Sequence, residues 1–171
     1  MSNTSRGRPP PVPGAAAAPE RLEGASPLDA HLGYWLRLVS NHVSHGFKQR
    51  LEREGVTVAE WVVLRALFDH EGIQPSALAE QLGLSRGAIS KLLGRLAAKS
   101  LVRIRADPAD GRAQVVGPSA SGRRLVPRLA ALADENDAAV FGALTEAERA
   151  ALRGLLEAIA GRLGLRGAPI D

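Results

Sequence analysis

The chain contains no cysteine, and this absence removes several classes of function at once. Without a thiol it has no disulfide, no cysteine nucleophile, no cysteine-ligated zinc site and no thiol-based redox sensor. It also lacks any apolar run near the roughly 20 residues that a membrane-spanning helix needs. The short apolar run 15–18 is surrounded by prolines and is not the core of a signal peptide. We therefore expect a soluble, cytoplasmic protein that does not contact a membrane.

Catalytic and cofactor motifs are missing as well. Serine, histidine and aspartate are present, but no nucleophile elbow, glycine-rich phosphate loop or paired-carboxylate motif accompanies them. His42 and His45 have the spacing of metal ligands on one helix face. Because His31 and His70 are distant in the sequence, a solvated histidine pair is the simpler interpretation. The sequence thus predicts no enzyme, no cofactor and no metal site.

What the chain does contain is a localised positive charge. All 171 residues together carry a net charge of +4. The segment Ser76–Arg124 alone has nine lysines and arginines against three acids, a net of +6, so the rest of the chain sums to −2. A basic surface confined to one part of a chain is typical of phosphate binding.

Capping and apolar patterns predict helices at both ends of the chain. A helix is expected from Ser26 to near Gly55, and a second from the capping box at Thr57 to Gly72. The later helices are expected to begin at Pro75, at Ser85, at Ser119 or Ser121, and at Thr145. In the fifth helix, Pro127 predicts a kink or a later start. We expect a mainly α protein, of the α+β winged helix-turn-helix class, with six helices and a small β-hairpin wing.

Four segments make up the expected domain organisation. The Pro/Ala/Gly-rich residues 1–25 have no periodic apolar pattern and are expected to form a disordered tail, whose Arg6, Arg8 and Arg21 could touch DNA or a partner helix. The terminal helices have apolar stripes with little else to cover them, which favours a homodimer. The remaining segments are therefore an N-terminal dimerisation helix (26–56), a winged helix-turn-helix domain (57–117) and C-terminal dimerisation helices (118–166).

Residues 74–114 have the pattern of a helix-turn-helix followed by a wing. The helix that opens at Pro75 ends before Gly83, which allows a sharp turn, and Ser85 caps the next helix. That helix directs an apolar face inward, formed by Ile89, Leu92, Leu93 and Leu96. Two strands, 101–104 and 114–116, flank a turn at 107–111 that contains proline and glycine.

The polar side chains of this segment match the needs of DNA binding. A recognition helix inserts its N-terminal turns into the major groove, with polar side chains at base edges. We expect Arg86 to pair with guanine, and Lys91 and Arg95 to hold phosphates. A wing arginine suits a narrow minor groove, and an aspartate there would orient it. Arg112 is the first choice for that arginine and Arg105 the second. The candidate DNA contacts are Ser76, Ala77, Ser85, Arg86, Gly87, Ala88, Ser90, Lys91, Arg95, Arg105, Asp110, Gly111 and Arg112. A solvated helix face and an ordinary surface hairpin are the alternatives.

The order of these elements resembles the MarR family (multiple antibiotic resistance regulators). The segments that look like its second helix, recognition module, wing and closing helix are VTVAEWVVLRAL, ALAEQLGLSRGAISKLLGRLAAKSLVRI, DPADGRA and ALTEAERAALRGLLEAIA. The resemblance covers residues 28–163 and implies a winged-helix homodimer whose first, fifth and sixth helices intertwine. It also implies a pseudo-palindromic operator, and it places the family's wing aspartate and arginine at Asp110 and Arg112.

Two positions depart from the family pattern. Ser100 replaces the glycine that usually precedes the first wing strand, which predicts a tighter or strained helix end. Pro118 and Ser119 replace the usual Leu-Thr at the start of the fifth helix, where serine can still act as a cap.

Regulators of this kind often bind a small aromatic or phenolic anion between the dimer helices and the DNA-binding lobe. Aromatic rings with a few convergent polar groups suit such an effector. The residues that would line this crevice are His31, Tyr34, Trp35, Leu38, His42, Trp61 and Arg65. The alternative is that both tryptophans belong to the core and the polar side chains are solvated.

The sequence therefore predicts a regulator of transcription, a repressor by family resemblance, that binds double-stranded DNA as a homodimer and is released by a small aromatic or phenolic ligand. Two alternatives remain open. One is an architectural DNA-binding protein that uses the same basic face without an operator. The other is a ligand-binding or protein-interaction module that has lost DNA binding.

Overall fold

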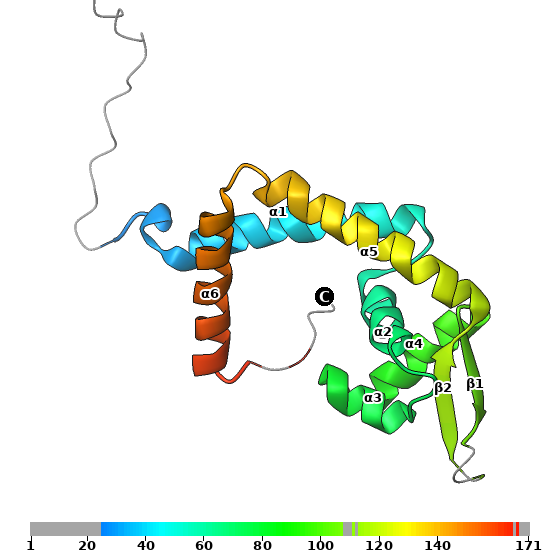
Figure 1. The fold of residues 1–171 in the computed structure, drawn as a ribbon. Coiled ribbons are helices and arrows are strands. Elements are labelled where there is room, and N and C mark those ends of the chain that lie inside the picture. The colour runs from blue at the N-terminus through cyan, green and yellow to red at the C-terminus, as the bar shows by residue number, and fades with distance from the viewer. Residues whose placement is uncertain (1–24, 108–110, 112, 166, 168–171) are drawn as a thin grey trace, which may run out of the picture. The chain divides into compact units, whose positions relative to one another are not determined.

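The fold is mainly α-helical, as the sequence predicts. The computed structural model describes residues 25–107, 111, 113–165 and 167. Within these residues the elements are a 3-10 helix (Leu28–Ala30), α1 (Leu32–Arg53), α2 (Val58–Phe68), α3 (Pro75–Leu82), α4 (Arg86–Ala98), β1 (Val102–Ala106), β2 (Gln114–Pro118), α5 (Ala120–Phe141) and α6 (Glu146–Arg162) (Figure 1). The chain divides into two compact units, residues 1–37 and residues 38–171. None of the described helices is both long and apolar enough to cross a membrane.

The helix starts that depend on a local cap lie where the sequence predicts them. The Ser85 hydroxyl accepts a hydrogen bond from the Ala88 amide at 3.1 Å. Capping boxes begin α2 at Thr57 and α6 at Thr145. Ser119 caps α5, so this helix begins before Pro127 and contains the proline.

Two helix boundaries differ from the prediction. Pro27 is extended and provides no side-chain cap, and His31 is extended as well, so α1 begins at Leu32 rather than after Ser26. The second helix ends at Phe68 instead of reaching Gly72. After the C-cap residue Asp69 the chain runs toward the hairpin, where Ile73 forms an antiparallel bridge with Val116. The expected tail lies outside the described residues except for Ala25.

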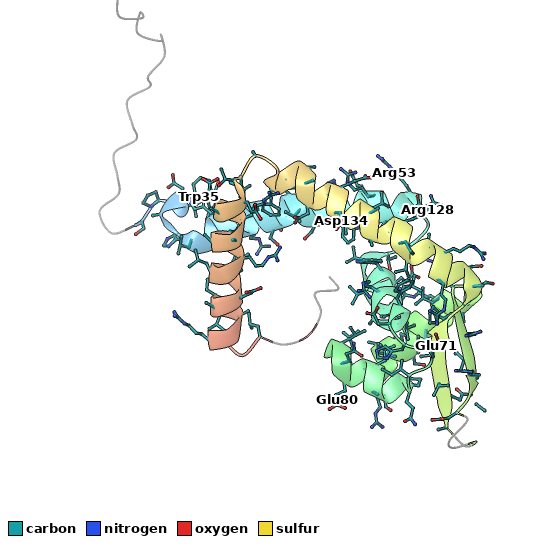
Figure 2. The ribbon with its side chains drawn as sticks, in the orientation of Figure 1. Trp35, Arg53, Glu71, Glu80, Arg128 and Asp134 are labelled. Atoms are coloured by element: carbon teal, nitrogen blue, oxygen red, sulfur yellow. The ribbon has the colours of Figure 1, made fainter. Side chains whose placement is uncertain are left out.

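The second unit joins part of α1 closely to α5. The side-chain amide of Asn136, a buried residue of α5, donates to the Val43 carbonyl at 3.2 Å. A Cβ atom added to Gly46 would lie 2.8 Å from the Asn136 side-chain oxygen. Further along the same pair of helices, Arg128 donates to Glu54 at 2.9 Å (Figure 2). The two helices therefore approach each other closely where Gly46 of α1 faces Asn136 of α5.

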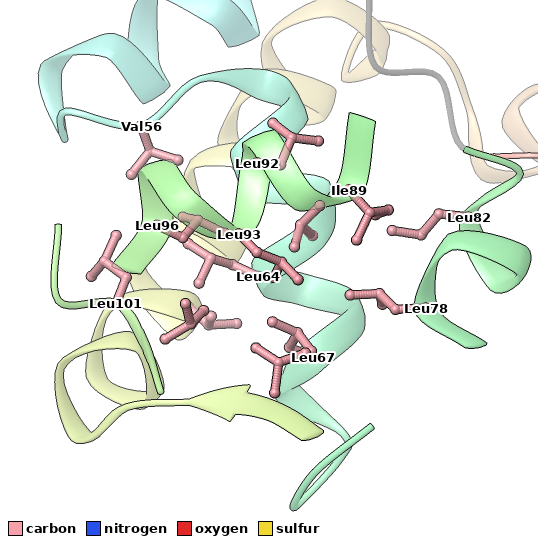
Figure 3. Close-up of a cluster of buried hydrophobic side chains, with 14 of the residues drawn as sticks. Val56, Leu64, Leu67, Leu78, Leu82, Ile89, Leu92, Leu93, Leu96 and Leu101 are labelled. Atoms are coloured by element: carbon pink, nitrogen blue, oxygen red, sulfur yellow. The ribbon is translucent and has the colours of Figure 1, made fainter. Parts of the chain in front are cut away.

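One apolar core holds the helix-turn-helix, the hairpin and parts of α1 and α5 together (Figure 3). The predicted inward face of α4 is buried, and so are Leu78, Ala79 and Leu82 of α3. Leu51 of α1 and Leu129 of α5, both fully buried, belong to the same core. The core thus extends past both ends of the segment 57–117 that the sequence suggests as a domain.

Candidate nucleic-acid interface

A left-handed glycine sets the turn between α3 and α4. Gly83 has a φ of 67°, which glycine adopts without the steric cost of a side chain. Its amide donates to the Glu80 carbonyl, and the Leu84 amide donates to the Ala79 carbonyl. These bonds close the end of α3, and α4 begins at Arg86 directly after the Ser85 cap.

The side of α4 opposite the core is exposed and positively charged. The predicted contact residues Ser85, Arg86, Gly87, Ser90, Lys91 and Arg95 are all exposed, and Ala88 is half-buried. The charged ends of Arg86, Lys91 and Arg95 form no hydrogen bond or ion pair with any residue that the structure describes. Three exposed cations, Arg86 in the first turn of α4 and Lys91 and Arg95 further along it, are therefore available to an external anion.

The start of α3 adds backbone donors beside this face. The side chain of Gln74 does not cap this helix. The backbone amides of the exposed first-turn residues Ser76 and Ala77 therefore have no capping side chain as acceptor. An open crevice separates these residues from the start of α4, and its lining comprises Ser76, Ala77, Ala79, Glu80, Leu84 and Arg86. Glu80, labelled on the outer side of α3 in Figure 2, is an acidic group at this surface that the sequence analysis did not select.

The two strands pair antiparallel as a hairpin, and the tip of this hairpin is only partly described. Val102 pairs with Pro118 at the root, and Ala106 pairs with Gln114 near the tip. Gly111 is exposed in the turn. The candidate wing residues Asp110 and Arg112 lie outside the described residues.

Other cations of the basic segment are occupied within the protein. Arg105 of β1 donates to the Glu71 carbonyl at 3.2 Å, and Arg123 of α5 donates to the Glu71 carboxylate at 3.0 Å. Glu71 lies beside the hairpin (Figure 2), so it connects β1 and α5 to the segment after α2. Lys99, at the end of α4, donates to both carboxylate oxygens of Glu60. The charge count from sequence therefore overstates the charge that is free to meet DNA.

Glu60 has an unusual environment for a carboxylate. Its side chain is buried, and burial alone would raise the pKa of the group. Hydrogen bonds from the Lys99 ammonium and the Thr57 backbone amide outweigh burial, and the pKa of Glu60 lies below its ordinary value. The group is therefore a permanently charged link between α2 and the end of α4 at neutral pH.

The seven predicted ligand residues lie in both units. In the first unit, Tyr34 and Trp35 are exposed and meet edge to face with ring centroids 5.3 Å apart, and His31 is exposed. In the second unit, Leu38 and His42 are exposed and Trp61 is half-buried against Phe47. Arg65 forms an ion pair with Asp69 at 2.6 Å. Trp61 thus contributes to packing, in line with the alternative interpretation of that residue.

No group of three or more potential metal ligands occurs among the described residues. The His45 ring nitrogen lies 2.9 Å from the Gln49 side-chain nitrogen, one helical turn away. One ring nitrogen of His45 is therefore in contact with Gln49, and His45 is one of the two histidines, with His42, that have metal-ligand spacing in the sequence.

Comparison with known proteins identifies the family. A family model described as MarR family matches residues 54–113, which run from the end of α1 to the wing. The HTH-type transcriptional repressor Rv2887 of Mycobacterium tuberculosis is 30% identical over 129 residues, which are 75% of this chain and 93% of that protein. This chain belongs to the MarR family.

Solved MarR-like structures have the same fold. Bordetella bronchiseptica BpsR, whose DNA binding is regulated by 6-hydroxynicotinic acid, superposes with a TM-score of 0.69 at 28% identity, covering 80% of this chain and 98% of that chain. Staphylococcus aureus MepR in complex with DNA superposes with a TM-score of 0.69 at 25% identity, covering 77% of this chain and 98% of that chain. The predicted family and fold class are confirmed, and the protein is a MarR-type transcriptional regulator.

Proposed function

We propose that this MarR-family protein is a cytoplasmic, sequence-specific repressor that binds a pseudo-palindromic operator as a homodimer. The observation that carries the proposal is the exposed face of α4, where Arg86, Lys91 and Arg95 have no partner among the described residues. Charged groups left unpaired on one rigid helix are suited to a polyanion, because binding releases the counterions of the nucleic acid. The amide groups of Ser76 and Ala77 would donate hydrogen bonds to a phosphate beside this face.

In the proposed complex, the residues from Ser85 to Lys91 enter the major groove. Arg86 reads a guanine, and Lys91 and Arg95 bind phosphates. The wing lies over the adjacent minor groove, with Arg112 inserted and Asp110 and Gly111 at the tip. Among the described residues, Arg105 lies next to the tip of the hairpin and donates to the Glu71 carbonyl, so Arg112 stays the first choice for the minor groove and Arg105 the second.

The proposed homodimer is supported by exposed apolar side chains in helices at both ends of the chain. On α6, Leu155 is 65% exposed and Ile159 is 49% exposed. In the first unit, Leu28 and Leu32 are 75% and 86% exposed. Covering such side chains with a second copy removes apolar surface from water, at about 25 cal/mol per Å². We accordingly assign dimerisation to residues 26–56 and 118–166, and DNA binding to 57–117.

Release from DNA is proposed to follow binding of a small aromatic or phenolic ligand. BpsR, a similar structure, is regulated by 6-hydroxynicotinic acid, which is an aromatic hydroxy acid. The exposed rings of Tyr34 and Trp35 offer aromatic surface for such a ligand, and Arg65 would exchange its ion pair with Asp69 for the anion. His31, Leu38, His42 and Trp61 complete the proposed set.

The test is a competition binding assay with DNA from immediately upstream of the gene and random duplex as competitor. It is run over a salt series and with a panel of phenolic and heteroaromatic carboxylates. Binding that survives a large excess of random duplex, and that one panel member abolishes, is the expected result. Equal loss to random duplex would support an architectural protein instead, and no salt-dependent binding would support a module that has lost DNA binding.

A further inference from the structure

One residue at the start of α5 holds the two peptide carbonyls that follow α4. The Ser119 hydroxyl donates to the Ser100 carbonyl at 2.7 Å, and the Ser119 amide donates to the Leu101 carbonyl at 3.0 Å. The same hydroxyl oxygen accepts a hydrogen bond from the Gly122 amide at 3.0 Å, which caps α5. A single serine therefore links the end of α4 to the first turn of α5 through three hydrogen bonds.

This joint has no free space. Gly122 is buried, and a Cβ atom added there would collide with the Leu101 carbonyl oxygen. Ser100 has a φ of 58°, a left-handed backbone conformation that residues other than glycine rarely adopt. The Leu101 amide is bonded to the Leu96 carbonyl of α4 at 2.9 Å. The peptide between Ser100 and Leu101 is thus fixed by α4 on one side and by α5 on the other.

The joint lies where the end of α4 and the root of the hairpin meet α5. Leu101 connects the end of α4 to β1, Ser119 connects β2 to α5, and Val102 pairs with Pro118 between them. In Figure 1 the root of the hairpin lies at the first turn of α5. These hydrogen bonds therefore form a direct connection through which the direction of α5 can act on the end of α4 and on the hairpin.

We propose that Ser119 is a positioning residue for DNA readout, whose hydroxyl fixes the angle of α4 and the wing relative to α5. The inference rests on the proposed function, because it assumes that α4 reads base edges. The 13 residues of α4 span about 20 Å, so a small rotation at the joint displaces the far end of the helix, where Arg86 lies. Bidentate pairing with a base requires close geometry, whereas contacts with phosphates tolerate displacement.

Loss of the hydroxyl should therefore weaken specific binding more than non-specific binding. The experiment uses the full chain and the duplex that wild-type protein selects from a random-sequence library. Affinity for this duplex and for a scrambled duplex is measured for wild type, Ser119→Ala, Ser119→Thr and Ser121→Ala. Ser121 is a matched control, because it is exposed on the same first turn and, among the described residues, its hydroxyl meets only Arg124.

We expect Ser119→Ala to lower the ratio of selected to scrambled affinity about tenfold, with scrambled affinity unchanged. Ser119→Thr restores the ratio because it keeps a hydroxyl, and Ser121→Ala behaves as wild type. If Ser119→Ala folds poorly, Ser119→Gly removes the same hydroxyl with a smaller loss of capping, because glycine is a tolerated N-cap residue. Folded fraction is followed by circular dichroism at the temperature of the binding assay.

Three results separate the possible failures. An unchanged ratio in the folded Ser119 variants would overturn the inference and leave the proposed function intact. Equal losses of both affinities, in proportion to the folded fraction, would show that the serine only stabilises the fold. A wild-type protein that selects no common sequence would overturn the proposed function, and the inference with it.

Discussion

The Lys99 ammonium nitrogen lies 2.7 Å from a carboxylate oxygen of Glu60 and 2.8 Å from the carbonyl oxygen of Gly55. The carboxylate is 1% exposed, whereas the lysine side chain is 38% exposed. The contact joins the end of α4 to the start of α2 and to the turn after α1. Because the partners are 39 residues apart in the sequence, the pair stabilises the tertiary arrangement rather than a single helix.

Replacing Lys99 by methionine should destabilise the protein by about 1–3 kcal/mol, because Glu60 then stays buried without its counter-ion. Partial exposure of the lysine places the expected value at the lower end of this range. The measurement is the free energy of unfolding in urea at pH 7. Lys91→Met is the matched control, since Lys91 is exposed and has no partner among the described residues. Equal stability of the two variants would contradict the prediction.

The same carboxylate should give the protein a specific acid sensitivity. Because hydrogen bonds hold the pKa of Glu60 below its ordinary value of 4.5 in the folded state, its ionised form stabilises the fold above that pH. This contribution is lost as the pH falls from 4.5 through the folded-state pKa. The stability difference between wild type and Glu60→Gln should therefore be largest at pH 6–7 and shrink below 4.5. A difference that stays constant down to pH 3.5 would refute the assignment.

Ser100→Gly should stabilise the protein by about 0.5–1 kcal/mol. Serine pays a steric cost in the left-handed conformation at φ 58°, and glycine does not. Part of the gain is offset because glycine has more conformational freedom in the unfolded chain. Thermal unfolding followed by circular dichroism measures the change. Ser100→Ala keeps the Cβ atom and should give no gain, so a similar rise in both variants would point to a cause other than backbone conformation.

Two arginines of α4 should differ in their effect on DNA binding. Arg86→Ala removes a proposed base contact and should relax preference at one base pair by about 1–3 kcal/mol. Arg95→Ala removes a proposed phosphate contact, so it should weaken binding to all duplexes and lower the slope of log affinity against log salt by about 1. Affinities for a set of single-base-pair substitutions, measured over a salt series, distinguish the two. The assignment fails if both variants lose affinity in the same sequence-independent way.

Features that depend on neighbouring residues could be predicted from the sequence. The caps at Thr57, Ser85, Ser119 and Thr145 and the turn at Gly83 form between residues a few positions apart. A periodic apolar pattern likewise identified the buried face of α4, since periodicity and burial have the same cause.

Features that depend on distant partners could not be predicted in this way. The sequence does not indicate that Ile73, in the segment after α2, pairs with Val116 of the hairpin. Nor does it indicate which cations of the basic segment are neutralised internally. Arg105 and Lys99 appear equivalent to Arg95 in a charge count, yet each has a partner more than 30 residues away.

The close approach of α1 and α5 at Gly46 has a consequence for how this protein can diverge. A Cβ atom at position 46 would stand 2.8 Å from the Asn136 side-chain oxygen, and that asparagine also donates to the Val43 carbonyl. A side chain at position 46 therefore requires the Asn136 side chain to shift or a smaller residue to replace it. In homologues that place alanine or a larger residue at the position of Gly46, we expect a smaller residue to replace Asn136, so that substitutions at these two sites are inherited as a pair.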